Sequence, residues 1–295
     1  MHVHRSASGF EVLAPAKLNL FLEVLAKRSD GFHEIETLMV PVGWYDTLHF
    51  ETDPGGDLRL DCQQFGPASE PIPTGDDNLV IRAVKLLRER SGVQQGARLR
   101  LVKRIPAASG LAGGSSDAAA ALVAANLGWQ LNWPRDELAP LAAELGSDVP
   151  FFLGRGAAVC RGRGEIMEPV AGLGPLWFVV VRPPVGLSTP AVYKACRPAI
   201  EPRRAESLVT CLRQGDLGSA AKHFHNALQL AAEPLCEWIE HLKQAFAASD
   251  CLAHQMSGSG SAYFGLCRHA RHARRIAASL RTRGVGQVCA VGAGI

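Results

Sequence analysis

Closely spaced cysteines are missing from this 295-residue chain: its eight cysteines are spread widely, and no two are closer than 15 residues. That spacing excludes paired-cysteine redox motifs and zinc ribbons. The first ten residues also lack a continuous apolar segment, so we expect neither a secretory signal nor a disulfide framework. We therefore expect a cytoplasmic protein whose cysteines remain thiols.

Long apolar runs and a strong charge imbalance are absent as well. The longest all-apolar runs are residues 118–125 and 176–181. Both are far shorter than the roughly 20 residues that cross a bilayer, so we expect no membrane partner. The net charge is only +3, which is too small to predict a nucleic-acid partner by itself.

The composition is that of an ordinary globular protein, with 47% hydrophobic and 20% charged residues. The first hundred residues contain short β-rich segments broken by turn residues, and helices mixed with a few strands follow. We therefore expect an α+β protein with two domains, residues 1–165 and 166–295.

The pattern of apolar residues gives the individual elements. The expected strands are 18–25, 34–40, 47–51, 58–62, 98–101, 176–182, 261–267 and 286–291. The expected helices are one that follows the polar cap 76–78, and 117–127, 134–145, 204–213, 217–231, 233–247 and 269–282. The segment 154–174 is rich in glycine, no element is assigned to it, and the change of domain is placed near its end.

The clearest functional signal is the small-residue segment 106–116 (PAASGLAGGSS), between an expected strand and an alanine-rich helix. This order predicts an anion site, because glycines let backbone N–H groups approach oxygen atoms and the helix dipole favours negative charge. Ser115 and Ser116 could cap the helix, bind phosphate or reach a metal ion. The segment is neither a Walker A motif nor GxGxxG, and the alternative is an ordinary glycine-rich turn.

Three further segments could carry chemistry. Lys17 and Asn19 share one face of a strand, Asp148 lies between a glycine and a proline, and the loop 256–261 (MSGSGS) permits close backbone approach to a ligand. Each has a structural alternative: a solvated lysine, a turn or cap aspartate, and a hairpin turn.

Together these segments resemble the GHMP kinase family, which includes galactokinase, homoserine kinase and mevalonate kinase. Residues 106–116 are similar to the phosphate loop of the family, and 257–261 to its third motif. The order of five more segments is similar to the branch that acts on a cytidine-diphosphate-linked methylerythritol. They are 15–20 (PAKLNL), 31–33 (GFH), 76–79 (DDNL), 146–151 (GSDVPF) and 188–190 (STP).

The resemblance covers residues 13–292 and implies a two-domain GHMP kinase fold with ATP and substrate in the cleft between the domains. It implies ATP-dependent phosphorylation of the 2-hydroxyl of the methylerythritol moiety, in the non-mevalonate isoprenoid pathway. Asp148 would take the hydroxyl proton, and Lys17 would keep Asp148 ionised and polarise the attacking oxygen.

The resemblance also implies which residues bind each ligand. Asn78 and Lys103 match positions beside the adenosine, and Mg²⁺ would screen the phosphates. The phosphate loop matches Pro106, Ala107, Ala108, Ser109, Gly110, Leu111, Ala112, Gly113, Gly114, Ser115 and Ser116. Ala107, Ala108, Ser109 and Ala112 stand where some members carry glycine, so backbone approach is slightly more restricted.

For the cytidyl substrate, His33 matches the cytosine-binding histidine, with Phe32 and Tyr193 as the aromatic residues on either side of the ring. Phe32 stands where tyrosine is common, so any hydrogen bond of that hydroxyl is lost. Asn19 and Thr189 match polar substrate contacts.

Other interpretations stay open on the sequence alone. The chain could be another small-molecule kinase of the family, for mevalonate or homoserine, or a non-catalytic ligand sensor with the same fold. The arginine-rich segment 268–283 could bind nucleic acid, but Ala273, Ile276, Ala277 and Leu280 favour a solvated amphipathic helix. His223 and His225 are not expected to bind metal, and no feature predicts the oligomeric state.

Overall fold

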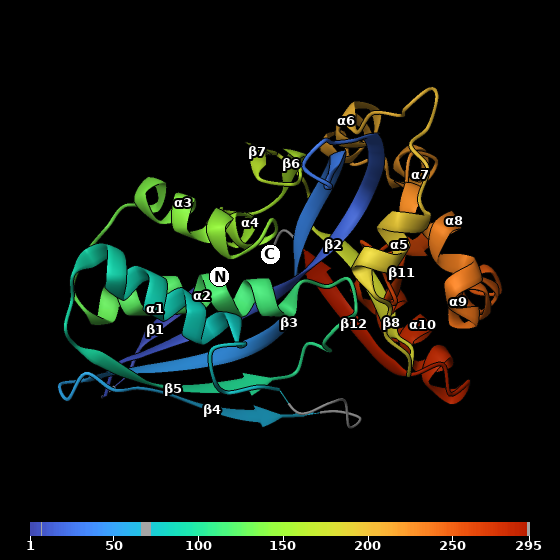
Figure 1. Cartoon of the computed structure of the whole chain (residues 1–295). Coiled ribbons are helices and arrows are strands. Elements are labelled where there is room, and N and C mark those ends of the chain that lie inside the picture. Colours follow the sequence, from blue (N-terminus) through green and yellow to red (C-terminus); the bar gives the residue numbers. More distant parts are fainter. Residues whose placement is uncertain (7, 66–71, 294–295) are drawn as a thin grey trace. The chain divides into compact units, whose positions relative to one another are not determined.

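The computed structural model describes residues 1–6, 8–65 and 72–293, and their strands and helices confirm the expected α+β architecture (Figure 1). The chain forms two compact units that alternate along the sequence. Unit 1 contains Met1–Ala16, Trp44–Pro106 and Ala112–Arg155, and unit 2 contains Lys17–Gly43, Ala107–Leu111 and Gly156–Ile295. The division into 1–165 and 166–295 follows the order of the sequence and stays a prediction.

Two long strands run through both units: β2 (Phe10–Lys27) and β3 (His33–Asp53). The sequence predicted two separate strands within β3, interrupted at Gly43, and this was wrong. Gly43 is exposed between buried Val42 and Trp44, so it follows the alternation of the strand. A glycine on the exposed face leaves the backbone ladder intact.

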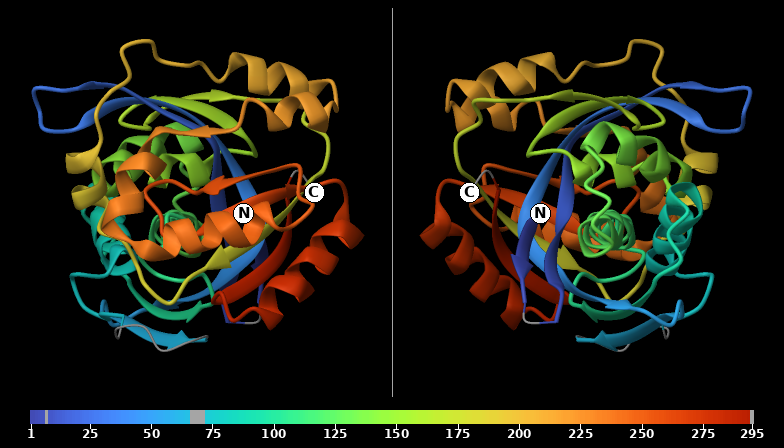
Figure 2. Two further views of the ribbon diagram at one scale, coloured as in Figure 1. Left: turned by 90° about the vertical axis from the view of Figure 1, so that its right-hand side faces the viewer. Right: turned by 90° about the vertical axis from the view of Figure 1, so that its left-hand side faces the viewer.

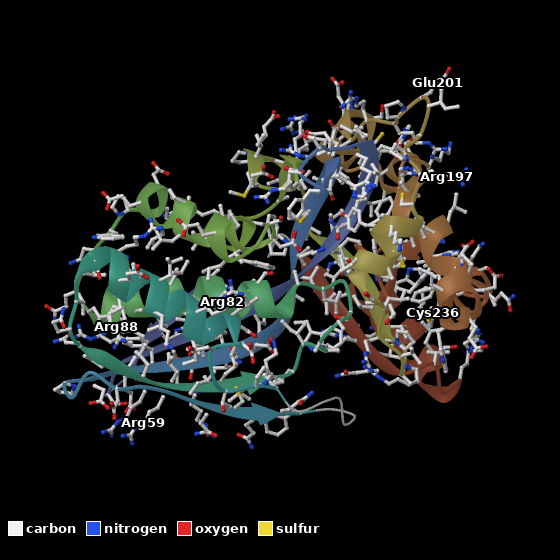
Figure 3. All side chains as sticks on the ribbon, viewed as in Figure 1. Arg59, Arg82, Arg88, Arg197, Glu201 and Cys236 are labelled. Atoms are coloured by element: carbon white, nitrogen blue, oxygen red, sulfur yellow. The ribbon has the colours of Figure 1, made fainter. Side chains whose placement is uncertain are left out.

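Unit 1 pairs its parts of β2 and β3 with β1 (His2–Arg5), β5 (Gly96–Lys103) and β4 (Leu58–Gln64), in the order β1-β2-β3-β5-β4. Helices α1 (Leu79–Ser91) and α2 (Gly113–Gly128) cover this sheet, and α3 (Arg135–Leu145) and the short α4 (Val149–Leu153) pack on those helices (Figure 1). The alanine-rich α2 is mostly buried. Helix α1 buries Ala83, Val84 and Leu87 and exposes Arg82, which Figure 3 labels. The expected cap of α1 is confirmed at Asn78, whose Oδ1 accepts a hydrogen bond from the Val80 amide.

Unit 2 contains a four-stranded antiparallel sheet in the order β10-β11-β8-β12. Its strands are Ala253–Met256, Tyr263–Cys267, Leu176–Arg182 and Gln287–Ala293, in that order. Helices α9 (Glu237–Ala247) and α10 (Ala270–Thr282) share one apolar core with this sheet (Figure 2). Its other elements are α5 (Thr189–Ala195), α6 (Glu206–Arg213), α7 (Leu217–Ala221), α8 (Ala227–Ala232) and the 3₁₀ turn η1 (Glu233–Leu235).

Several elements of unit 2 differ from the expectation. The segment 154–174, to which the sequence assigned no element, contains a hairpin of β6 (Ala158–Gly162) and β7 (Ile166–Pro169), and β6 pairs antiparallel with β3. The helix expected over 217–231 is broken by β9 (His225–Asn226), which pairs with β2. The first part, α7, ends at Ala221, and Asn226 begins the second part: its side chain caps α8 and donates to the carbonyls of Met256 and Gly258.

The arginine-rich segment forms the expected amphipathic helix, α10. Its apolar stripe, from Ala273 to Leu280, is buried, whereas Arg271, Arg274 and Arg275 are exposed. Within the described ranges, no helix is both long enough and apolar enough to cross a bilayer.

Candidate active site

The phosphate loop predicted at 106–116 ends inside a helix, because α2 already begins at Gly113. The first turn of α2 contains small residues and no acidic side chain. The amides of such a turn and the positive end of the helix dipole favour an anion. Ser115 is half-buried and Ser116 is fully buried. The Ser116 Oγ and the Asp117 Oδ1 are buried without a hydrogen-bond partner among the described residues, a polar arrangement typical of functional sites.

Lys103, expected beside the adenosine, lies at the end of β5 and is only 5% exposed. Its ammonium group donates hydrogen bonds to the carboxylates of Asp46 and Asp117, both of which are buried. Burial opposes the charge on Lys103, but the two carboxylates outweigh it and raise the pKa of the lysine. Burial also raises the pKa of Asp117, to about 7. Sequence reasoning missed both aspartates.

Asp148 occupies the N-cap position of α4, as the turn-or-cap alternative predicts, but its side chain does not cap that helix. All five residues of α4 are buried, so the backbone that carries Asp148 is firmly packed. Asp148 is itself half-buried. A carboxylate on a rigid element that it does not need to cap suits a positioned reactive group.

Lys17 lies on β2 in unit 2 and is 4% exposed. Its Nζ donates a hydrogen bond to the Asn19 Oδ1, so the predicted shared face of these two residues is confirmed. The Asn19 Nδ2 donates to the Thr37 Oγ1 over 2.8 Å, and that hydroxyl donates to the carbonyl of Phe21 over 2.6 Å. This chain of hydrogen bonds fixes the direction of the lysine side chain.

The middle of the phosphate loop meets β2 and the third motif within unit 2. The Ser257 Oγ accepts a hydrogen bond from the backbone amide of Asn19 over 3.3 Å and donates one to the Gly110 carbonyl over 3.2 Å. The Lys17 amide donates to the Leu111 carbonyl. Gly110 has φ +75°, and a Cβ there would lie 2.1 Å from the Ser257 carbonyl oxygen, so this approach requires glycine. Three of the four segments singled out in the sequence therefore converge.

The third motif itself connects the antiparallel strands β10 and β11, as the hairpin alternative predicts. It also contacts a predicted substrate residue, because the hydroxyls of Thr189 and Ser259 are 2.7 Å apart. The structural and functional interpretations of this loop are compatible.

The residues expected to bind cytosine lie at the start of β3 and on α5. The rings of His33 and Tyr193 have centroids 5.1 Å apart and planes inclined by 35°. Burial and the nearby charge of Lys27 lower the pKa of His33, which favours the neutral ring with one donor and one acceptor nitrogen. Phe32 is 49% exposed, and the guanidinium of Arg163 lies 4.6 Å from its ring centroid. Sequence reasoning missed Arg163.

Comparisons with known proteins identify the family of the chain. The model of the GHMP kinases N terminal domain matches residues 78–156, and the GHMP kinases C terminal model matches residues 208–286. This chain belongs to the GHMP kinase family. It is 41% identical over 271 residues to a 4-diphosphocytidyl-2-C-methyl-D-erythritol kinase from Pelotomaculum thermopropionicum, with 91% of this chain and 93% of the relative covered. A relative of the same name from Nocardioides sp. is 40% identical over 92% of this chain and 93% of its own length.

Solved structures give the same result for the fold. A crystal structure of a 4-(cytidine 5′-diphospho)-2C-methyl-D-erythritol kinase matches with a TM-score of 0.79 at 38% identity, over 97% of this chain and 99% of that one. A homoserine kinase from Cytophaga hutchinsonii has a TM-score of 0.75 at 19% identity, covering 100% of this chain and 97% of that one. That match shows the fold alone.

Two buried glutamates of this GHMP kinase secure the chain that follows Tyr193. Glu23 on β2 accepts hydrogen bonds from the Arg203 amide and from the His225 Nε2. Glu36 on β3 accepts from the Ala205 amide over 2.8 Å and from the guanidinium groups of Arg161 and Arg204. They tie the connection between α5 and α6 to β2 and β3, the strands that carry Lys17 and His33.

We expect Glu36→Gln to destabilise the protein by about 1–3 kcal/mol at pH 7, because a buried carboxylate loses charge-assisted hydrogen bonds. Burial alone would raise the pKa of Glu36, but the bonds from Ala205, Arg161 and Arg204 lower it. A carboxylate whose pKa is lowered by folding stabilises the protein above its unfolded pKa, and this stabilisation is lost as pH falls through the folded pKa.

Urea unfolding of Glu36→Gln and wild type at pH 7 and near pH 4 measures this difference. The matched control is Glu168→Gln, which removes the exposed second partner of Arg161 and should change stability little. Equal stability losses in the two variants at pH 7 would contradict the assignment.

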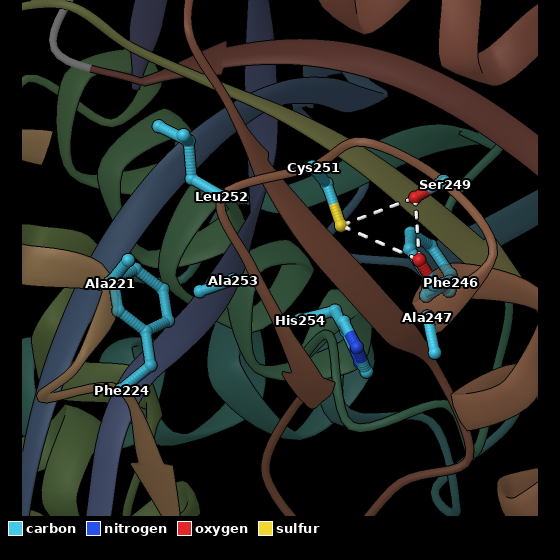
Figure 4. Close-up of a pocket in the computed structure, with 9 residues that line it drawn as sticks. All are labelled: Ala221, Phe224, Phe246, Ala247, Ser249, Cys251, Leu252, Ala253 and His254. Atoms are coloured by element: carbon cyan, nitrogen blue, oxygen red, sulfur yellow. Dashed lines mark hydrogen bonds between the residues drawn. The ribbon is translucent and has the colours of Figure 1, made fainter. Parts of the chain in front are cut away.

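A pocket of about 360 Å³ lies beside β10 in unit 2 (Figure 4). Its lining includes Phe224, Phe246, Cys251 and His254, and no residue of the predicted site. Burial lowers the pKa of His254 and raises that of the Cys251 thiol, so both groups are expected to be neutral near pH 7. Among the described residues, no group of three or more His, Cys, Asp or Glu side chains could hold a metal ion.

Proposed function

We propose that this protein transfers the γ-phosphoryl group of ATP to the 2-hydroxyl of 4-diphosphocytidyl-2-C-methyl-D-erythritol, the cytidyl substrate, in the non-mevalonate isoprenoid pathway. The similarity to kinases of that name over about nine-tenths of the chain carries the proposal. The ring pair of His33 and Tyr193 supports it, because a flat base binds well beside aromatic rings. Since ATP and the cytidyl substrate are small molecules of central metabolism, we place the enzyme in the cytoplasm without a nucleic-acid partner.

In this proposal Asp148 accepts the proton of the 2-hydroxyl as the oxygen attacks the γ-phosphorus. The ammonium of Lys17 favours the ionised carboxylate and polarises the attacking oxygen. Backbone amides of the phosphate loop hold the phosphates, so most of the rate enhancement comes from positioning and charge stabilisation.

Magnesium bound to the ATP phosphates neutralises part of their charge. The half-buried hydroxyl of Ser115 in the first turn of α2 fits such an ion, whereas Ser116 is fully buried. Mg²⁺ commonly keeps several waters and takes few protein ligands beside phosphates, so a site without a carboxylate cage fits its chemistry.

At the other end of the substrate, Phe32 and Tyr193 would stack on cytosine and His33 would hydrogen-bond to it. Asn19 and Thr189 would contact the polar part of the substrate. The side chain of Asn78 already caps α1, and its role beside the adenosine would be compatible with that cap.

ADP release with three acceptors tests the proposal. We expect turnover with the cytidyl substrate and none with mevalonate or homoserine. Turnover with either of those acceptors and none with the cytidyl substrate would overturn it. Nucleotide binding without ADP release from any acceptor would instead favour the ligand sensor.

We expect Tyr193→Ala to raise KM for the cytidyl substrate about tenfold or more, because base stacking on an aromatic ring contributes about 1–3 kcal/mol. KM for ATP should change less than about twofold, since that ligand does not use the ring. Tyr193→Phe is the matched control, because it keeps the ring. Steady-state kinetics with each substrate varied would contradict the role if both KM values rose together.

A further inference from the structure

Three buried charged residues of unit 1 connect the two ends of the phosphate loop. The Asp46 Oδ1 accepts hydrogen bonds from the amides of Arg104 and Ile105, the residues just before the loop, over 2.5 and 2.8 Å. The Lys103 Nζ donates both to the Asp46 Oδ2 and to the Asp117 Oδ2. Asp117 lies near the start of α2, just after the loop. A continuous set of charged hydrogen bonds therefore links loop entrance and loop exit.

Further contacts hold the loop entrance in place and pack the start of α2 against it. The Trp44 indole donates a hydrogen bond to the Arg104 carbonyl over 3.1 Å. A Cβ on Gly113 would lie 2.9 Å from the Ile105 Cγ2 and 3.2 Å from the Lys103 Nζ. The first turn of α2 is thus packed directly against the residues that enter the loop, and Gly113 leaves no spare room.

The charges of this cluster are also mutually dependent. The three side chains are each at most 5% exposed, so water cannot stabilise the charge of Lys103, Asp46 or Asp117. Removing one partner of a buried ion pair leaves a buried charge uncompensated. An arrangement of this kind is useful where a backbone must be held in one geometry.

We propose that Asp46, Lys103 and Asp117 are positioning residues for the nucleotide: they fix the separation of the loop ends and thereby the direction of the amides at the start of α2. Lys103 acts through the loop, since both carboxylates already engage its ammonium, and not by touching the adenosine. The inference rests on the proposed kinase function for the identity of the nucleotide.

The test measures the Kd of ATP by calorimetry, and KM for ATP and for the cytidyl substrate. We expect Asp117→Asn, which keeps the side-chain shape, to weaken ATP binding and raise KM for ATP about tenfold, with KM for the cytidyl substrate nearly unchanged. Asp57→Asn, on an exposed residue of the same unit, is the matched control.

A double variant separates positioning from simple stability. Lys103→Met alone leaves two buried carboxylates, whereas Lys103→Met with Asp117→Asn keeps the net charge of the cluster. We expect the double variant to regain part of the thermal stability that Lys103→Met loses, while ATP binding stays weak. Recovery of wild-type ATP affinity together with stability would overturn the inference.

The remaining outcomes are also decisive. If Lys103→Met weakens ATP binding but Asp117→Asn and Asp46→Asn do not, Lys103 contacts the nucleotide directly and the inference is wrong. If the wild type binds ATP but does not phosphorylate the cytidyl substrate, the proposed function fails. The calorimetric comparison of the variants would still decide the role of the cluster.

Discussion

Replacing Asp148 by asparagine is expected to lower kcat by about two orders of magnitude or more, while the Kd of ATP changes less than about twofold. Asparagine has nearly the same shape but cannot accept the proton of the attacking hydroxyl. The packed backbone of α4 and the similar shape of asparagine mean that the substitution should leave the fold intact.

Steady-state kinetics with saturating ATP and cytidyl substrate measure this effect directly. Asp136→Asn is the control, because Asp136 is an exposed carboxylate in the first turn of α3. Wild-type kcat in Asp148→Asn would exclude this residue as the base.

The second large effect is expected at Lys17. We expect Lys17→Met to lower kcat by about two orders of magnitude, because the apolar side chain cannot polarise the attacking oxygen or stabilise charge that develops during transfer. Methionine fills similar space without the positive charge. The Asn19 Oδ1 loses its donor, so thermal unfolding should show a modest loss of stability.

Lys222→Met, at an exposed lysine in unit 2, controls for the loss of one positive charge. A change confined to KM, with normal kcat, would mean that Lys17 only binds substrate.

The double variant Lys17→Met with Asp148→Asn tests whether the two residues act together. Groups that serve one step of a reaction show strongly non-additive effects, so the double variant should be little slower than the slower single variant. Losses that multiply would indicate independent roles.

Local patterns in the sequence predicted the elements whose cause is local. The amphipathic periodicity of α10 and the capping role of Asn78 were both confirmed. Elements formed by distant pairing were missed. His225 and Asn226 become β9 because they pair with β2, and no pattern within 217–231 shows that pairing. The uninterrupted course of β3 past Gly43 likewise depends on its neighbours in the sheet.

The candidate site divides in the same way. The resemblance supplied Lys17, Asn19, His33, Tyr193 and the phosphate loop, and the structure places several of them in contact within unit 2. The resemblance could not supply the partners that hold these residues, because the partners are distant in sequence: Glu36 and Ala205 are 169 positions apart, and Asp46 and Lys103 are 57 apart. One signal in the sequence could have indicated such partners: a carboxylate among apolar neighbours, such as Asp117 in the alanine-rich helix. A buried carboxylate needs a partner.

The passage of β2 and β3 through both units has a consequence for expressing parts of the gene. Leu22, Val24 and Ile35 belong to the same apolar cluster as Val179 and the helices packed on its sheet. A fragment that starts at residue 166 would lack these strands and leave that surface uncovered, which favours aggregation. The second half of the reading frame does not encode the complete core of unit 2, so a version that begins at residue 166 is a poor starting point for crystallisation or for engineering.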